Sequence, residues 1–278
     1  MAILLLAAMG ISPTAQSAAP KRIVSLNLCT DQILLDLVSR DRIAAISHLA
    51  GDASVSSAAD KAVGMPSTRG EAEQVVGFDP DLVLAGQFST PATVALLERI
   101  GRRVVKVPLA SDLAGIRDAI RQVGVAVGAE PEADALIRAF DARVAVASPA
   151  SDTYRPTALV YQVNGLASSA GSLADAVMSA AGYVNHGRSL GLGGGGSVSL
   201  EVLVAHPPEA IVLTGPIDEY RTAVADNLRH PVLVALRRSR ETVIVPWRYW
   251  LCGTQHTATA IELLAAARAR VGARRSGT

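Results

Sequence analysis

The chain has 278 residues, of which half are apolar and 18% are charged, enough to build one or two domains with well-packed cores. This composition excludes an intrinsically disordered protein. The formal net charge is +1 and the basic residues are scattered, apart from a short arginine-rich stretch at 268–275, so the charge distribution does not favour nucleic-acid binding.

The first residues indicate an export signal. An apolar run from Ala2 to Ile11 is followed by small and polar residues, with small side chains in place before a cut near Ala18. The run is shorter than the roughly 20 apolar residues that span a bilayer, and the basic leader of a secretory signal is missing. We predict a signal peptide at residues 1–19 and a soluble, periplasmic mature protein without a membrane helix. A frayed N-terminal helix is the alternative.

Short apolar runs then alternate with longer segments of helical period, a pattern typical of α/β units on a mostly parallel sheet. Strands are predicted at Arg22–Leu26, Ile43–Ser47, Leu82–Ala85, Val104–Val107, Thr157–Tyr161, Ala210–Leu213 and Thr242–Val245. The first four are separated from the last three by a long helical segment with Pro131 at its start. The sequence therefore predicts two Rossmann-like α/β lobes with a ligand cleft between them. The N-terminal lobe is expected at 20–128, a linking backbone helix at 129–150 and the C-terminal lobe at 151–278.

Two segments of similar pattern occur once in each lobe. They are "EAEQVVGFDPDLVLAG" at 71–86 and "SLEVLVAHPPEAIVLTG" at 199–215. Each predicts a short helix led by a glutamate, then a proline-containing turn and a buried strand that ends in glycine. A glutamate in the first turn of a helix offsets the positive end of the helix dipole, which would explain one such residue alone. Its repetition at equivalent places in the two lobes favours a shared functional role.

These segments carry a resemblance to a known family. Together with "RIVSLNLCTDQILLDL", the linking helix and the closing "LRHPVLVALRRSRETVIVPWRYWLCGTQHTATAIELLA", they resemble the helical-backbone (class III) periplasmic substrate-binding proteins. Members of that family deliver vitamin B12, ferric siderophores and heme to ABC importers. The resemblance extends from about Lys21 to about Ala267, nearly the whole mature chain.

The resemblance implies a binding protein rather than an enzyme. It implies a monomer that captures a large metal chelate, a ferric siderophore or a cobalamin with heme as the alternative, and delivers it to an ABC permease and its ATPase. Glu73 and Glu201 would lie one on each lobe and pair with arginines of the permease, which suits a transient complex. Glu71 is close enough to Glu73 to make this contact instead. A single linking helix also implies a small closing motion.

The cleft is expected beyond the carboxyl ends of the strands, where ligands of open α/β sheets bind. The turn that holds Asn27, Cys29 and Thr30 follows the first strand and should face it. We expect Thr30 to cap the next helix and Asp31 to lie in its first turn. On the other lobe, the loop "PWRYWLCGTQH" occupies the equivalent position and brings Cys252 to the opposite wall.

The two cysteines, Cys29 and Cys252, allow three interpretations. Free thiols that line the pocket are favoured. A disulfide is common in an oxidising compartment, but a bond across the cleft would lock it and needs a short Cα separation. As soft ligands of a metal centre, the thiolates would act with His48 or His256.

The same reasoning selects further cleft residues. The aromatic stretch at 247–250 combines a flat apolar face with polar tips, suited to a ring system or a catecholate. Its arginine could pair with a ligand carboxylate; the alternative is that its tryptophans fill the core. Polar groups after other strands could orient a chelate. The predicted ligand-binding residues are Asn27, Cys29, Thr30, His48, Gln87, Phe88, Gln162, Asn164, Trp247, Arg248, Tyr249, Trp250, Cys252 and His256.

Other functions lack their motifs. The "GLGGGG" run at 191–196 matches a dinucleotide-binding pattern but follows no strand, and no phosphate-binding loop, nucleophile elbow or zinc-binding His-Glu helix occurs. The sequence therefore indicates no catalytic residue, no cofactor and no resident metal. Two alternatives remain open. One is a secreted enzyme with a reactive Cys29 and His48 or His256 as its base, and the other is a binding module for a sensor or an outer-membrane receptor complex.

Overall fold

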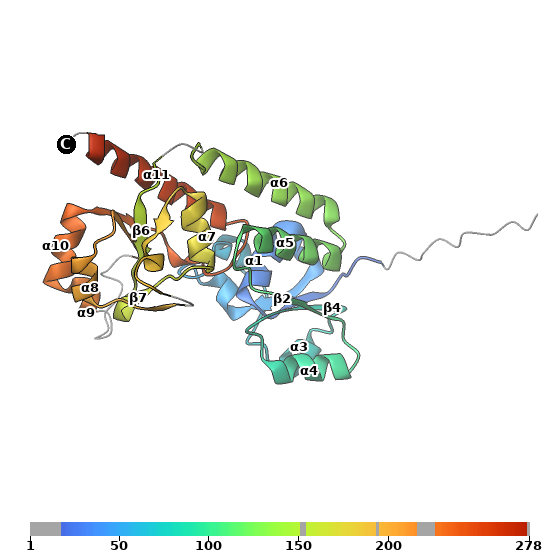
Figure 1. Ribbon diagram of the computed structural model, residues 1–278. Coiled ribbons are helices and arrows are strands. Elements are labelled where there is room, and N and C mark those ends of the chain that lie inside the picture. The colour runs from blue at the N-terminus through green and yellow to red at the C-terminus, as the bar shows by residue number, and fades with distance from the viewer. Residues whose placement is uncertain (1–17, 151–153, 193–194, 216–225, 277–278) are drawn as a thin grey trace, which may run out of the picture.

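The structure of the protein, a computed structural model, describes residues 18–150, 154–192, 195–215 and 226–276. The predicted signal peptide falls outside the described residues, apart from its last two positions. Two separate parallel sheets lie at opposite ends of the molecule, and helices α6 and α11 run along one side of both (Figure 1). The predicted α/β class with mostly parallel sheets is confirmed.

The N-terminal sheet has five parallel strands in the order β3-β2-β1-β4-β5. Its strands are β1 (Ile23–Ser25), β2 (Ile43–Ser47), β3 (Ser67–Thr68), β4 (Leu82–Gly86) and β5 (Val104–Val107). The central strand β1 is buried at all three positions, because a parallel strand is covered on both faces. The strand order reverses between β1 and β4. Ligands of open α/β sheets bind at the carboxyl ends of strands at such a point.

The C-terminal sheet has four parallel strands in the order β11-β10-β6-β8, and a two-stranded antiparallel ribbon pairs β7 with β9. These strands are β6 (Thr157–Val160), β7 (Leu166–Ala167), β8 (Val184–Asn185), β9 (Gly196–Ser197), β10 (Ala210–Leu213) and β11 (Glu241–Ile244). The middle strand β10 is buried at all four positions.

Helices connect the strands and cover the sheets. The α-helices are α1 (Leu28–Leu37), α2 (Ala59–Ala62), α3 (Ala72–Gly77), α4 (Pro91–Arg99), α5 (Leu113–Val127), α6 (Glu130–Ala147), α7 (Leu173–Ala180), α8 (Leu200–Ala205), α9 (Asp226–Arg229), α10 (Pro231–Ser239) and α11 (Thr257–Ser276). Short 3₁₀ helices are η1 (Arg40–Arg42), η2 (His48–Gly51), η3 (Val163–Gly165), η4 (His186–Arg188) and η7 (Trp247–Tyr249). Within the described ranges, no helix is both long and apolar enough to cross a bilayer.

Helix α6 carries the chain from one lobe to the other. Its buried side chains, Ala133, Ile137, Phe140 and Val144, recur every three or four residues and form one apolar face. That face packs against α5 of the N-terminal lobe and α11 of the C-terminal lobe. The largest apolar cluster consequently continues through α6 from one lobe into the other.

All seven strands predicted from the sequence are present, and their ends agree to within one residue. Four further strands, β3, β7, β8 and β9, were not predicted. Each has only two residues, which is too short to produce an apolar run or an alternating pattern.

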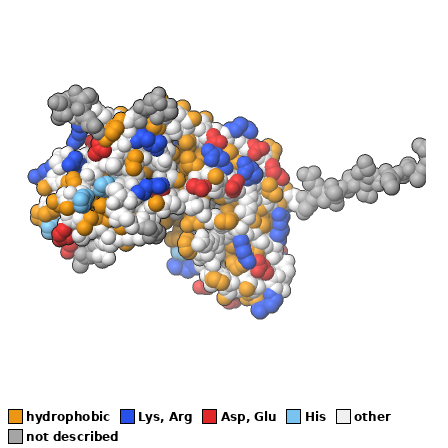
Figure 2. Space-filling model, in the orientation of Figure 1, with side chains coloured by type: hydrophobic (Ala, Val, Ile, Leu, Met, Phe, Trp, Pro, Cys, Tyr) orange, Lys and Arg blue, Asp and Glu red, His pale blue; other side chains and the backbone are white. Residues whose placement is uncertain are grey.

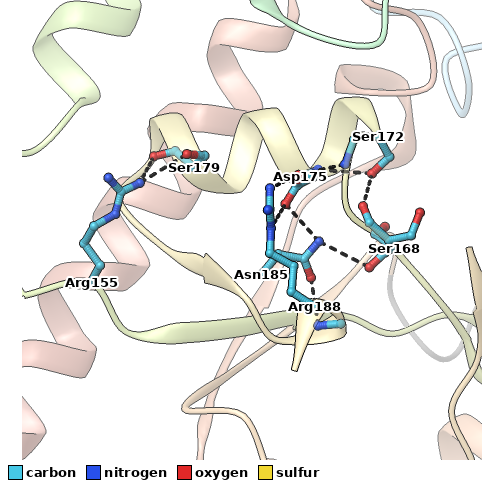
Figure 3. A network of polar contacts seen from close by, with 10 residues as sticks. Arg155, Ser168, Ser172, Asp175, Ser179, Asn185 and Arg188 are labelled. Carbon is cyan, nitrogen blue, oxygen red and sulfur yellow. Dashed lines mark hydrogen bonds and ion pairs between the residues drawn. The ribbon is translucent and has the colours of Figure 1, made fainter. Parts of the chain in front are cut away.

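A buried carboxylate organises the loops of the C-terminal lobe (Figure 3). Asp175 on α7 accepts hydrogen bonds from the Gly171 N–H at 2.9 Å and Asn185 Nδ2 at 3.1 Å, and it pairs with Arg188 at 2.6 Å. Burial opposes ionisation, but these bonds lower the pKa of Asp175. Asn185 Oδ1 in turn accepts from the Gly187 N–H at 3.0 Å. The network therefore fixes the turn at the carboxyl end of β8.

Candidate ligand-binding site

The turn after β1 is held by Asn27, which caps helix α1. Asn27 has an extended backbone, and its Oδ1 accepts a hydrogen bond from the Cys29 N–H at 2.9 Å. The expectation that Thr30 caps this helix is wrong. Thr30 lies inside the first turn, where its Oγ1 donates to the Asn27 carbonyl at 2.9 Å and lies 2.8 Å from Ser25 Oγ, so the hydroxyl faces the core.

Gly86, at the end of β4, makes room for Asn27. A Cβ built on Gly86 would lie 2.5 Å from Asn27 Cγ. The amide of Asn27 therefore packs directly on the backbone of β4. The Gly86 N–H donates to Ser89 Oγ at 3.0 Å, which shapes the next turn. Packing thus explains why β4 ends in glycine: a larger side chain at position 86 would displace Asn27, next to the point where the strand order reverses between β1 and β4.

Asp31 lies in the first turn of α1, as predicted, but its side chain is fully buried. The carboxylate accepts hydrogen bonds from the Ser47 N–H at 3.2 Å and from Ser47 Oγ. Burial raises the pKa of Asp31 to about 7, although the bonds from Ser47 partly offset this effect. Asp31 thereby ties α1 to the carboxyl end of β2, where the cavity described next begins.

A cavity of about 310 Å³ opens at the carboxyl ends of β1, β2, β3 and β4. Its volume lies at the lower end of the range of small-molecule sites, about 300–1,000 Å³. We call it the cleft cavity. It is lined by Leu26, Asn27, Leu28, Cys29, Ser47, His48, Leu49, Thr68, Arg69, Gly70, Phe88, Ser89, Thr90, Leu109, Leu251 and Cys252. The last two belong to the C-terminal lobe, so both lobes contribute walls. Figure 2 shows the surface hollowed between the two lobes.

The cleft cavity brings together five of the fourteen residues predicted to bind ligand. They are Asn27, Cys29, His48, Phe88 and Cys252. Thr30 and Gln87 line a smaller adjoining cavity of about 20 Å³ instead.

The prediction of free cysteines is wrong, because Cys29 and Cys252 form a disulfide with a Cα–Cα distance of 5.1 Å. They therefore share one wall of the cleft cavity and do not face each other across it. The bond does not close the cavity, since both cysteines are part of its lining, where α1 meets the loop after β11. It also leaves no thiolate to act as a metal ligand or as the nucleophile of the alternative enzyme.

Further contacts join the lobes beside the disulfide, and we call this region the lobe seam. Arg248 Nη1 donates to the Ala53 carbonyl at 3.2 Å, and Ser57 Oγ donates to the Arg248 carbonyl at 2.8 Å. Gly253 packs so closely on Ala110 that a Cβ at Gly253 would lie 2.5 Å from Ala110 Cβ. The seam thus fixes the loop that carries Cys252 against the N-terminal lobe.

The aromatic stretch serves the core and the lobe seam. Trp250 is buried in the main apolar cluster, and Trp247 and Tyr249 pack against the same cluster. The guanidinium of Arg248 lies 4.9 Å from the ring centre of Tyr249. None of these four residues lines a described cavity, and the burial of Trp250 agrees with the alternative that a tryptophan fills the core.

The remaining predicted residues lie away from the cleft cavity. His256 sits in the seam, 3.5 Å from Asp36, and burial lowers its pKa. The backbone of Gln162 and that of Asn164 bond to the side chain of Asn227 at 3.1 Å each. Neither Gln162 nor Asn164 lines a described cavity.

Sequence reasoning missed Arg69, which lines the cleft cavity directly after β3. The strand that positions it has only two residues and produced no pattern. Gly70, whose φ is 82°, forms the turn after this strand, and a glycine at that position is a signal in the sequence that could have indicated the turn.

The two glutamates predicted to dock a permease are both exposed. Glu73 lies in the first turn of α3 and Glu201 in the first turn of α8, one on each lobe. Glu71 precedes α3 as its capping residue and is exposed as well. Hydrogen bonding by Ser199 lowers the pKa of Glu201, so its charge persists well below neutral pH.

No resident metal centre is evident in the described part of the chain, where no three His, Cys, Asp or Glu side chains converge.

Comparison with known proteins supports this description. The model of a family described as periplasmic binding proteins matches residues 23–238. The cobalamin-binding protein of Halobacterium salinarum is 28% identical over 216 residues, which are 76% of this chain and 58% of that protein. The chain therefore spans less than two thirds of the length of this curated relative.

Solved structures share the fold. The periplasmic heme-binding protein RhuT from Roseiflexus sp. RS-1 superposes with a TM-score of 0.72 at 22% identity, covering 90% of this chain and 98% of that one. The periplasmic vitamin B12 binding protein BtuF of Vibrio cholerae has a TM-score of 0.65 at 16% identity, covering 91% and 98%. At these identities the likeness is one of fold.

Proposed function

Because the chain belongs to the periplasmic binding protein family, we propose that it is the periplasmic substrate-binding component of an ABC importer. In this role it captures a large metal chelate between its lobes and delivers it to the membrane permease. The observation that carries this proposal is the position of the cleft cavity. It opens where the strand order of the N-terminal sheet reverses, and Leu251 and Cys252 of the C-terminal lobe form part of its wall. The family and the structural neighbours are binding proteins, which favours this role over an enzyme.

The chelate we propose is a ferric siderophore or a cobalamin, with heme as the alternative. Support comes from the curated relative, which is named for cobalamin binding, and from structural neighbours named for heme and vitamin B12. Support also comes from the chemistry of the cleft cavity, which combines exposed apolar side chains with a few polar groups. Its volume suits one edge of such a chelate, with the rest held between the lobes.

Delivery is proposed to use Glu73 and Glu201 as contacts to cationic residues of the permease. Exposed charge pairs steer and orient a transient complex more than they strengthen it. An N-terminal export signal at residues 1–19 would place the mature protein in the periplasm, where this complex forms.

The experiment that tests the proposal is a binding titration of the mature protein with cyanocobalamin, hemin and a panel of ferric siderophores. Each ligand absorbs visible light, so equilibrium dialysis measures the bound fraction directly. We expect saturable binding of one ligand at a 1:1 ratio, weakened when Phe88 in the cleft cavity is replaced by Ala. Val146→Ala, on the exposed side of α6, is the matched control and should leave affinity unchanged. Absence of binding for every chelate would overturn the proposal.

A further inference from the structure

The cleft cavity carries an unbalanced positive charge. Arg69 and His48 both line it, and no aspartate or glutamate is among its lining residues. Asp31, two residues after Cys29, is fully buried and does not line the cavity, and Glu71, which follows Gly70, is exposed and does not line it either. A cavity with a cation and no counter-charge disfavours a cationic ligand and favours an anionic one.

The backbone at Arg69 is fixed by hydrogen bonds, while its side chain can still bind a ligand. Its backbone N–H donates to Gln74 Oε1 at 3.2 Å, and Thr68 Oγ1 donates to the same oxygen at 2.9 Å. The Gly70 N–H closes the turn by donating to Thr68 Oγ1 at 3.0 Å. Among the described residues, no hydrogen bond or ion pair engages the guanidinium of Arg69. The backbone is therefore fixed while the charged group remains available.

The cavity also has an apolar side. Phe88 is 76% exposed, Leu49 41% and Leu109 37%, and all three line it. Large apolar side chains this exposed in a cavity favour a ligand with a flat or hydrophobic face. The lining therefore combines one cationic side chain, Arg69, and a hydrogen-bonding imidazole, His48, with an apolar wall.

We propose that Arg69 makes the cleft cavity selective for chelates that present a carboxylate at their edge, over neutral chelates of the same shape. The planar guanidinium accommodates a carboxylate with two parallel N–H···O bonds, which a neutral amide cannot match. His48 provides a second donor to the same anionic edge, and the apolar face of the chelate rests on Phe88. This inference rests on the proposed function and specifies its substrate class.

The test uses pairs of probes that share a scaffold and differ in charge. One pair is hemin, with two carboxylates, and its dimethyl ester. The other is a monocarboxylic acid derivative of cyanocobalamin and cyanocobalamin itself, where one side-chain amide replaces the acid. We expect the wild-type protein to bind the acid at least about tenfold more tightly than the neutral partner in at least one pair, with a preference that falls as salt is raised.

Three variants isolate the role of Arg69. Arg69→Gln should remove the preference for the acid by weakening binding of the acid more than binding of the neutral probe, whereas Arg69→Lys should retain part of the preference. Arg138→Gln, an exposed arginine on α6 outside the cleft cavity, should change neither. Circular dichroism melts verify that all three fold.

The outcomes separate the two claims. Binding of acid and neutral probes with equal affinity, or a preference that survives Arg69→Gln, would overturn the charge selectivity while the chelate-binding function stands. Failure of both members of both pairs to bind would overturn this inference, and failure of the siderophore panel as well would overturn the proposed function.

Discussion

Cys29 and Cys252 are 223 positions apart in the sequence and are joined by a disulfide, which links the first turn of α1 to the loop after β11. The bond lies where the two lobes meet and contributes to the wall of the cleft cavity. It therefore stabilises the folded chain and also helps to shape the cleft cavity.

Removing this bond should destabilise the protein strongly. A disulfide that closes so long a loop restricts the unfolded chain, and a loss of about 3–5 kcal/mol in the free energy of unfolding is expected. The change is Cys29→Ser with Cys252→Ser, measured by urea denaturation. As a control, a reducing agent should lower the midpoint of the wild type and leave the double variant unaffected. Equal midpoints for the two proteins would contradict the prediction.

The close approach of Asn27 to Gly86 predicts a coupled pair of substitutions. Gly86→Ala should displace the capping side chain, and Asn27→Ala should remove the cap, at a cost of about 1 kcal/mol. Because Asn27→Ala also removes the group that Gly86→Ala would clash with, the double variant should lose less stability than the sum of the single variants. Strict additivity in thermal melts would show that the two side chains do not interact.

Burial of Asp31 predicts a pH dependence of stability. The pKa of its carboxyl is raised from 3.8 to about 7, so the folded protein holds this proton over a range in which the unfolded chain has released it. Asp31 therefore lowers the free energy of unfolding progressively as pH rises from about 4 to about 7, by on the order of 4 kcal/mol in total. Urea denaturation of Asp31→Asn, which keeps an acceptor for Ser47, should show an advantage over wild type that grows across this window. An advantage that does not change with pH would contradict the assignment.

Charge reversal of the two exposed glutamates should separate binding from delivery. Glu73→Arg combined with Glu201→Arg is expected to abolish ligand uptake by cells that express the importer, while ligand affinity stays unchanged because both side chains lie outside the cleft cavity. Glu132→Arg on the exposed face of α6 is the matched control and should support normal uptake. Normal uptake by the double variant would contradict the docking role of the two glutamates.

The elements that could be predicted from the sequence are those in which apolar residues form a continuous run or recur at a regular spacing. Strands such as β4 and β10 are continuous apolar runs because helices cover both faces of their sheets. The buried face of α6 recurs at helical spacing from Ala133 to Val144. The two-residue strands carry no such pattern, since their position depends on pairing with a distant strand.

The site was harder to predict because proximity to a strand end does not determine which way a side chain points. Trp250 follows β11 yet is buried in the core, whereas Arg69 follows a strand too short to recognise and lines the cavity. The disulfide depended on the distance between the lobes, which only the tertiary packing sets. Reasoning from a cleft with its cysteines on opposite walls therefore favoured free thiols.

Within the described residues the main chain passes between the two sheets once, through α6, and the disulfide makes a second covalent link at the lobe seam. Two covalent links at separate places restrict how the lobes can move relative to each other. Rotation about the line through α6 and the disulfide strains neither link, whereas sliding or twisting of one lobe on the other strains at least one. Opening of the cleft cavity should therefore follow mainly this one rotation, and reduction of the disulfide would allow further relative motions of the lobes.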